Sequence, residues 1–157
     1  MMKSLNRYQG DPAIKITPDG ATMKFIGGQP IMDVGFENAV QISLFTKKGW
    51  WGNILFPVAS QKIGSDYEKQ CNEPIVSLSS INNVTDAADK ALAWMKEKSI
   101  ASKIDNTVTN PNSNNINMKS RITPLGSDSE VFIFSKNGMN WIGQIQNPAF
   151  DQFPEVN

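Results

Sequence analysis

The sequence predicts an α+β fold in which two helices pack on one face of a mostly antiparallel sheet, with hairpins near both ends of the chain. Short segments that alternate apolar and polar residues surround Asp19-Gly20 and Asn137-Gly138. Both dipeptides are favoured in two-residue hairpin turns. Between the hairpins lie two stretches whose apolar residues recur at helical spacing. These three observations indicate the fold class.

The first hairpin and the first helix occupy the N-terminal third. Residues 14–16 and 23–25 alternate around the first turn. A helix is expected from Asp33, whose carboxylate can cap free amides, to about Phe45. The apolar face of this helix is narrow and consists of Phe36, Ala39, Val40, Ser43 and Leu44.

Residues 53–82 show the weakest periodicity of apolar and polar residues in the chain. Residues 54–58 form a short apolar piece, and Pro57 argues against a central strand there. Residues 75–81 fit either a strand or a buried connection.

The second helix has the clearest signal, from Asn83 to about Lys98. Asn83 with Asp86 three residues later suits an N-terminal cap, and Lys96 suits the negative C-terminal end. Its apolar face consists of Val84, Ala87, Ala88, Ala91, Leu92 and Met95, with Trp94 at the edge.

Four strands are expected after this helix. The first covers residues 104–108, and a loop covers 110–115. Residues 116–123 alternate as a half-buried strand does, and strands at 131–134 and 139–142 complete the second hairpin. Residues 1–146 are expected to form a single domain, and residues 147–157 an extended tail.

Composition excludes several kinds of function. The chain has 157 residues with 15 basic and 15 acidic side chains, so no net charge attracts it to nucleic acid or to an anionic membrane. It contains no histidine, the commonest general base and metal ligand. We therefore expect no catalytic residues, no cofactor and no metal, and a soluble protein without a membrane span.

The sequence contains no recognisable catalytic motif. The single cysteine, Cys71, has no histidine to activate it. Two carboxylates would suffice for glycoside hydrolysis, but none stands in a recognisable catalytic motif. The candidates are Glu37, Asp66, Glu68, Glu73, Asp86 and Asp89.

Trp50 and Trp51 are the first candidates for a binding site. Adjacent side chains point in different directions, so one ring is expected to anchor the core while the other is left for a partner. Lys47 and Lys48 lie beside them, and Trp is enriched at interface hot spots. The alternative is that both rings are core; Trp94 and Trp141 are expected in the core.

Several short sequence motifs resemble those of the small baseplate protein of Mu-like phages, which belongs to the contractile-tail baseplate wedge and sheath-initiator group. The similarity covers roughly residues 5 to 145. The motifs are Gly27-Gly-Gln-Pro30, Asp33, Gly35-Phe-Glu-Asn-Ala39, Ile42-Ser-Leu-Phe-Thr46, Gly49-Trp-Trp-Gly52, Ile63-Gly-Ser65, Ala91-Leu-Ala-Trp94, Ile100-Ala101 and Trp141. Two positions depart from the group: residues 97–103 lack its Glu-Pro-Arg motif, and Ser99 stands where the Mu-like branch tends to have glycine.

The resemblance implies a structural subunit of a contractile tail, from a phage, prophage or phage-derived bacteriocin. Its expected partners are other wedge and hub proteins and the tail sheath protein, with several copies in a symmetric baseplate assembled in the host cytoplasm. The sheath would add a strand to an exposed edge within residues 104–142, with Lys119 and Arg121 as gatekeeper charges. The alternatives are a tail-associated cell-wall hydrolase using two carboxylates and a small cytoplasmic adaptor of related fold.

Overall fold

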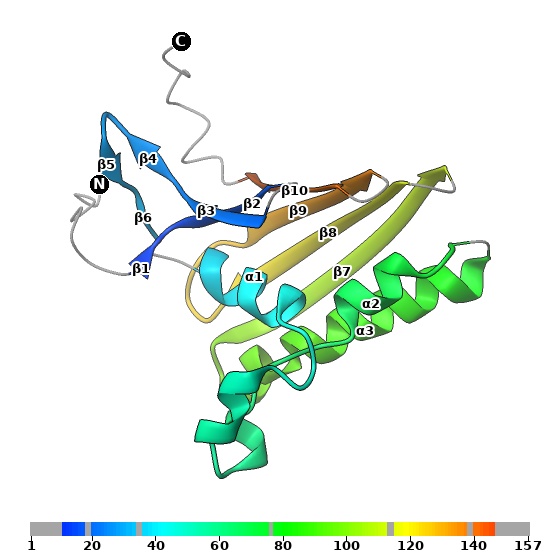
Figure 1. The fold of residues 1–157 in the computed structure, drawn as a ribbon, viewed down its shortest axis with the longest axis horizontal. Helices are drawn as coiled ribbons and strands as arrows, with labels where there is room; N and C mark the ends of the chain where they lie inside the picture. Colours follow the sequence, from blue (N-terminus) through cyan, green and yellow to red (C-terminus); the bar gives the residue numbers. More distant parts are fainter. Residues whose placement is uncertain are drawn as a thin grey trace.

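The computed structural model of this chain is α+β, as the sequence predicts (Figure 1). It describes residues 11–17, 20–33, 36–75, 77–112, 115–137 and 140–146. The expected tail at 147–157 lies outside the described residues. The architecture has a four-stranded antiparallel sheet, three α-helices and an N-terminal set of short two-stranded ladders.

The main sheet is an antiparallel meander built by the last part of the chain. Its strands lie in the order β10-β9-β8-β7, so each pairs with its neighbour in sequence. The predicted strand positions are confirmed, with longer strands than expected; the bounds are β7 Ala101–Asn112, β8 Asn115–Pro124, β9 Glu130–Asn137 and β10 Asn140–Gln146. The loop expected at 110–115 is correspondingly shorter, because pairing continues to Asn112 and Asn115.

Strand β8 lies inside this sheet and is half-buried, as its alternation predicts. Lys119 and Arg121 on the other face are exposed. Because β7 and β9 flank β8 on its two sides, the hypothesis that Lys119 and Arg121 guard a sheet edge is wrong. The inward residues Ile116, Met118, Ser120 and Ile122 are buried.

Within the described residues there are three α-helices, whereas the sequence predicts two. They are α1 (Glu37–Phe45), α2 (Tyr67–Asn72) and α3 (Leu78–Glu97). The additional helix, α2, falls in the stretch with the least sequence pattern. It has six residues and buries Tyr67 and Cys71, too few turns for a helical period to show in the sequence.

Both predicted helix starts are wrong by several residues. Helix α3 begins five residues earlier than Asn83, since the Ser77 hydroxyl accepts the amide hydrogen of Ser80. Helix α1 begins at Glu37, although the Asp33 carboxylate still accepts the amide hydrogen of Asn38 at 2.7 Å.

The three helices and the sheet share one hydrophobic core. Phe45 of α1 contacts Tyr67 of α2 and Phe134 of β9 edge-on, with ring centroids 5.6 and 5.4 Å apart. Trp94 at the edge of the α3 face is partly buried and donates its ring N–H to Ser43 Oγ. The predicted apolar face of α3 is confirmed, because all its members are buried or pack on the core: Val84, Ala87, Ala88, Ala91, Leu92 and Met95.

The N-terminal strands form a separate β-arm, residues 11–33, which lies beside β10 through β2 (Figure 1). The pairing of β2 with β3 confirms the first predicted hairpin, whose residues 18 and 19 lie outside the described residues. Two further ladders, β1–β6 and β4–β5, were not predicted. The strands are β1 Asp11–Pro12, β2 Ile14–Thr17, β3 Gly20–Met23, β4 Phe25–Ile26, β5 Gln29–Pro30 and β6 Met32–Asp33.

Candidate docking surface

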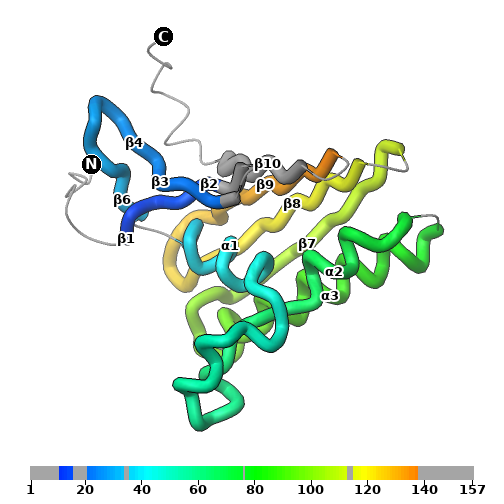
Figure 2. Tube along the Cα trace, viewed as in Figure 1, coloured from blue at the N-terminus to red at the C-terminus, as the bar shows by residue number. Residues whose placement is uncertain are grey.

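The two tryptophans open a loop that projects away from the helices and the sheet (Figure 2). We call residues 47–65 the tryptophan loop. Trp50 is 36% exposed and Trp51 is 76% exposed, so the two rings differ as predicted. Neither ring belongs to the core cluster. The expectation that one of them anchors the core is therefore wrong.

Trp50 packs within its own loop. A methyl group added at Gly52 would lie 2.1 Å from the Trp50 ring, so the ring covers the backbone at this glycine. The centroids of the two indole rings are 5.5 Å apart. Trp50 thus supports the loop, and Trp51 lies at its surface.

Besides the two tryptophans, this loop exposes further large apolar side chains that the sequence does not single out. Ile54 is 86% exposed and Leu55 is 72% exposed, on the 3-10 helix Trp51–Leu55. Phe56, Val58 and Ile63 are also exposed. A soluble monomer rarely leaves so many neighbouring large apolar residues in water, and such patches mark interaction sites. In the sequence, the short apolar run 54–58 is the signal for these exposed residues.

Hydrogen bonds close the loop at two levels. At its base, the Ser65 amide donates to Thr46 O at 2.8 Å, and the Ser65 hydroxyl donates to Leu44 O at 2.7 Å. Further out, Asn53 Nδ2 donates to Ile63 O at 2.7 Å, and Ile63 N donates to Asn53 Oδ1 at 2.9 Å. The loop is therefore held in one shape before any partner binds, which lowers the entropy cost of binding.

Gly64 is required at the base of the loop. Its φ is +128°, and an added methyl group would lie 2.6 Å from the carbonyl oxygen of Lys47. Only glycine fits so close to a neighbouring backbone with this conformation.

Lys47 and Lys48, the two cations of the predicted site, point back toward α2. Lys48 forms an ion pair with Asp66, and Lys47 Nζ lies 3.8 Å from Glu68 Oε1. Exposed ion pairs contribute little to stability. These pairs hold both lysine side chains near α2 instead of beside the exposed apolar residues of the loop.

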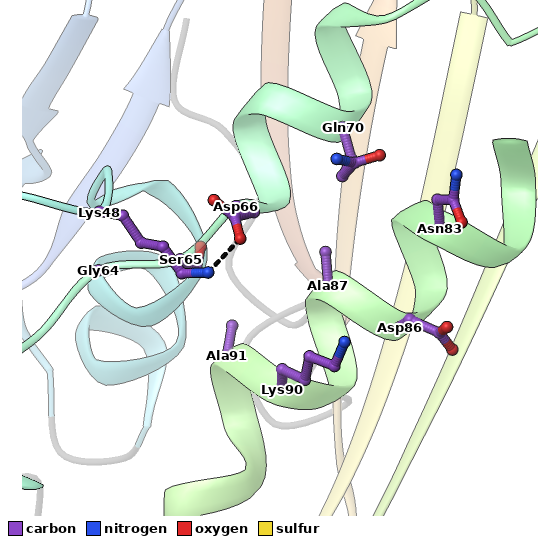
Figure 3. A pocket seen from close by; sticks show the side chains of 10 residues that line it. All are labelled: Lys48, Gly64, Ser65, Asp66, Gln70, Asn83, Asp86, Ala87, Lys90 and Ala91. Atoms are coloured by element: carbon purple, nitrogen blue, oxygen red, sulfur yellow. Dashed lines mark hydrogen bonds and ion pairs between the residues drawn. The ribbon is translucent and has the colours of Figure 1, made fainter.

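A polar cavity of about 370 Å³ lies between α3 and the base of the tryptophan loop (Figure 3). Lys48 and Asp66 line one side, and Asn83, Asp86 and Lys90 of α3 line the other. Positive and negative groups balance here. The cavity is therefore a polar surface beside the exposed apolar residues of the loop.

The other predicted partner residues lie elsewhere. Lys119 and Arg121 are on the exposed face of the main sheet, and Arg121 lies opposite Asp105 of β7. Trp141, expected in the core, lies in β10 with its backbone opposite Lys136; its side chain is outside the described residues. The structure thus brings together Lys47, Lys48, Trp50 and Trp51 and separates them from the sheet residues.

Among the residues that the structure describes, no group of three or more acidic or cysteine side chains could hold a metal. Of the six carboxylates considered for hydrolysis, Asp66 and Asp86 line opposite sides of the polar cavity. The other four lie elsewhere: Glu37 on α1, Asp89 on α3, and Glu68 and Glu73 on and after α2. In the same described part, none of the helices combines the length and hydropathy of a membrane span.

No family model, no curated protein and no solved structure matches this chain.

Proposed function

We propose that this chain is a structural subunit of the baseplate of a contractile tail, contacting the wedge and starting the sheath by strand addition. The resemblance of the central sequence motifs supports this role, and so do two geometric features of the chain. One is an open strand edge, and the other is the preformed apolar tryptophan loop.

The open edge of β7 is the observation that carries the proposal. This strand is 12 residues long and pairs only with β8 among the described strands. An unpaired edge offers a row of backbone N–H and C=O groups to a strand from another chain. At the two ends of the sheet, β10 lies beside strand β2 of the β-arm and β7 lies beside helix α3, so β7 is the end whose neighbour outside the sheet is not a strand.

The sequence of β7 is suited to an edge that must not aggregate before assembly. Lys103 and Asp105 are exposed on it, and Lys103 Nζ lies 2.7 Å from Asp105 Oδ2. Pro111 lies near its end. Charges and proline on an edge oppose unspecific pairing. This is the gatekeeper role that the sequence analysis expected of Lys119 and Arg121.

The tryptophan loop supplies the second contact, to a wedge protein. Its exposed apolar side chains suit an apolar pocket on the partner, with the polar cavity at the base of the loop as the rim of the interface. Interfaces commonly combine an apolar centre containing Trp or Phe with a polar rim. The two contacts lie on different parts of the subunit, as a protein that joins wedge to sheath needs.

The experiment places proline on β7 in a phage or prophage that carries the gene. Amides of neighbouring residues in a strand point to opposite edges, so Thr107→Pro and Val108→Pro test both directions. The matched controls are Thr107→Ala and Val108→Ala. The proline variant whose melting temperature equals that of its alanine control has lost a donor only on the free edge.

Electron microscopy of the particles then gives the outcome. We expect the stable proline variant to enter baseplates and to give tubes without an extended sheath, while its alanine control gives sheathed tails. Normal sheathed tails from the stable proline variant would overturn the strand-addition role.

The hydrolase alternative has less support. Such an enzyme needs two carboxylates facing a substrate cleft. In the cavity beside α3, Asp66 already forms an ion pair with Lys48. A cell-wall digestion assay with purified protein tests this reading directly, and we expect no clearing.

A further inference from the structure

The β-arm contains a second open strand edge. Strand β3 continues into β4 with only Lys24 between them, so residues 20–26 form one extended segment, which we call the arm strand. Among the described strands, β3 pairs only with β2, and β4 pairs only with β5. Each part of the arm strand therefore has one paired neighbour.

Hydrogen bonds at Lys24 show which edge of the arm strand is occupied. The Lys24 amide donates to Ala13 O at 2.8 Å, and the Lys24 carbonyl accepts from Ile31 N at 2.9 Å. In an antiparallel ladder the N–H and C=O of one residue point to the same edge. Both neighbouring segments therefore lie along one edge. The backbone groups of the alternate residues Met23 and Phe25 point to the other edge.

The outer part of the arm strand lies in open space. Met23, Phe25 and Ile26 are all exposed. At the turn that follows, a methyl group added at Gly27 or Gly28 would meet no atom within 4 Å. Figure 1 shows β4 and β5 pointing away from the helices and the main sheet. The apolar side chains of this segment are therefore accessible to another chain.

The arm strand lacks the features that protect the edge of β7. Strand β7 carries an exposed lysine and aspartate and a proline near its end, which oppose unspecific pairing. In the arm strand Lys24 is the one charged residue, and it forms an ion pair with Glu37 of α1. An exposed apolar edge without such protection is a site where a further strand pairs.

The sequence of the arm strand is complementary to a second copy of itself. A two-fold axis pairs two identical strands antiparallel, with the same surface used on both copies. An axis at Met23 includes the whole arm strand and places the two Met23 residues opposite each other. Ala21 then lies opposite Phe25 of the other copy. Thr22 lies opposite Lys24, so the pairing brings no like charges together.

Other positions of the axis are less favourable. An axis at Lys24 would place two lysines opposite each other, and like charges in that position destabilise a strand pair. An axis at Thr22 would extend the pairing beyond Gly20, where the pairing of β2 with β3 ends. The axis at Met23 avoids both costs and pairs backbone groups that point to the free edge.

We propose that the chain forms a two-fold dimer through antiparallel pairing of the arm strands, residues 20–26, centred on Met23. The dimer covers the open edge of the arm and the exposed side chains beside it. It does not depend on the sheath-receiving role of β7.

Analytical ultracentrifugation of the purified full chain, over a series of protein concentrations, tests the dimer. We expect a reversible equilibrium between monomer and dimer. Met23→Lys should raise the dissociation constant of the dimer on the order of tenfold, because two lysines then face each other across the axis. Met23 is exposed in the single chain, so the circular dichroism spectrum and melting temperature of this variant should match those of the parent.

A matched control and a charge exchange make the test specific to the axis. Leu125→Lys places the same charge at an exposed apolar site outside the arm and should dimerise like the parent. Met23→Glu alone should dimerise as weakly as Met23→Lys. An equimolar mixture of these two variants should form heterodimers, since a lysine then faces a glutamate.

Three results would overturn the proposal. The first is a parent chain that stays monomeric at every concentration, which would leave the arm edge to a strand of another protein. The second is a dimer whose dissociation constant is unchanged by Met23→Lys. The third is a mixture of the Met23→Lys and Met23→Glu variants that associates no more tightly than either variant alone.

Discussion

Trp50 and Trp51 lie next to each other with their ring centroids 5.5 Å apart, yet Trp51 is exposed to about twice the extent of Trp50. Trp50 covers Gly52, and Trp51 is exposed to solvent in a preformed loop. Trp50 therefore packs within the loop and Trp51 is exposed beside it, and neither ring is part of the core.

Alanine at the two positions should therefore have different effects. Trp51→Ala should leave the free energy of unfolding almost unchanged and weaken incorporation into baseplates, since an exposed aromatic anchor is lost. Trp50→Ala should cost about 1–2 kcal/mol, because the ring is only partly buried. Chemical denaturation and particle composition measure the two effects. Equal losses of stability would show that both rings are structural and would remove the docking argument.

Gly52→Ala tests the contact beneath Trp50. The new methyl group cannot coexist with the ring at 2.1 Å, so the ring must move into solvent. We expect red-shifted tryptophan fluorescence and a loss of stability. In a Trp50→Ala background the same glycine substitution should cost much less, as a double-mutant cycle reveals. An additive cycle would mean that the two residues do not depend on each other.

Ser99 follows helix α3 with a φ of +56°, a conformation that suits glycine. The Ile100 amide donates to Met95 O at 2.9 Å and closes the helix end. Ser99→Gly should raise the free energy of unfolding by about 0.5–1 kcal/mol, because glycine adopts this conformation without steric cost. Ser99→Ala is the matched control and should give no gain. A destabilised glycine variant would contradict this account.

Cys71 should be unreactive in the folded protein. It is 2% exposed, and burial raises the pKa of its thiol to about 12, against a hydrogen bond from Tyr67. At pH 8 a disulfide reagent should label the native chain only slowly and the guanidinium-unfolded chain at once. The thiol contribution to stability is present below pH 9.0 and is lost as the pH rises toward 12. An exposed control, Ser102→Cys in a Cys71→Ser background, should react rapidly; equal rates for both thiols would contradict burial.

The sequence predicted the periodic elements well. The alternation from Ile116 to Ile122 and the face from Val84 to Met95 specify buried positions directly, and the structure confirms both. The helix starts were wrong because several polar residues can cap: Ser77 serves α3 where Asn83 was expected. The spacing of apolar residues does not show which of several polar residues caps a helix.

The candidate site was predicted only in part. The difference between Trp50 and Trp51 was foreseen from their adjacency, but the support of Trp50 by Gly52 depends on the 3-10 turn. Which strand forms the sheet edge depends on long-range pairing, so Lys119 and Arg121 were assigned to an edge that β7 occupies. The arm attachment also joins residues distant in sequence, such as Asn38 and Ile14.

A cryo-electron microscopy reconstruction of the intact tail is the most direct measurement of the central claim. The account predicts density for this chain in the baseplate, with a strand from the sheath protein paired along β7 and the tryptophan loop seated in a pocket of a wedge protein. A baseplate that lacks this chain, or that contains it with the β7 edge in solvent, would contradict the account.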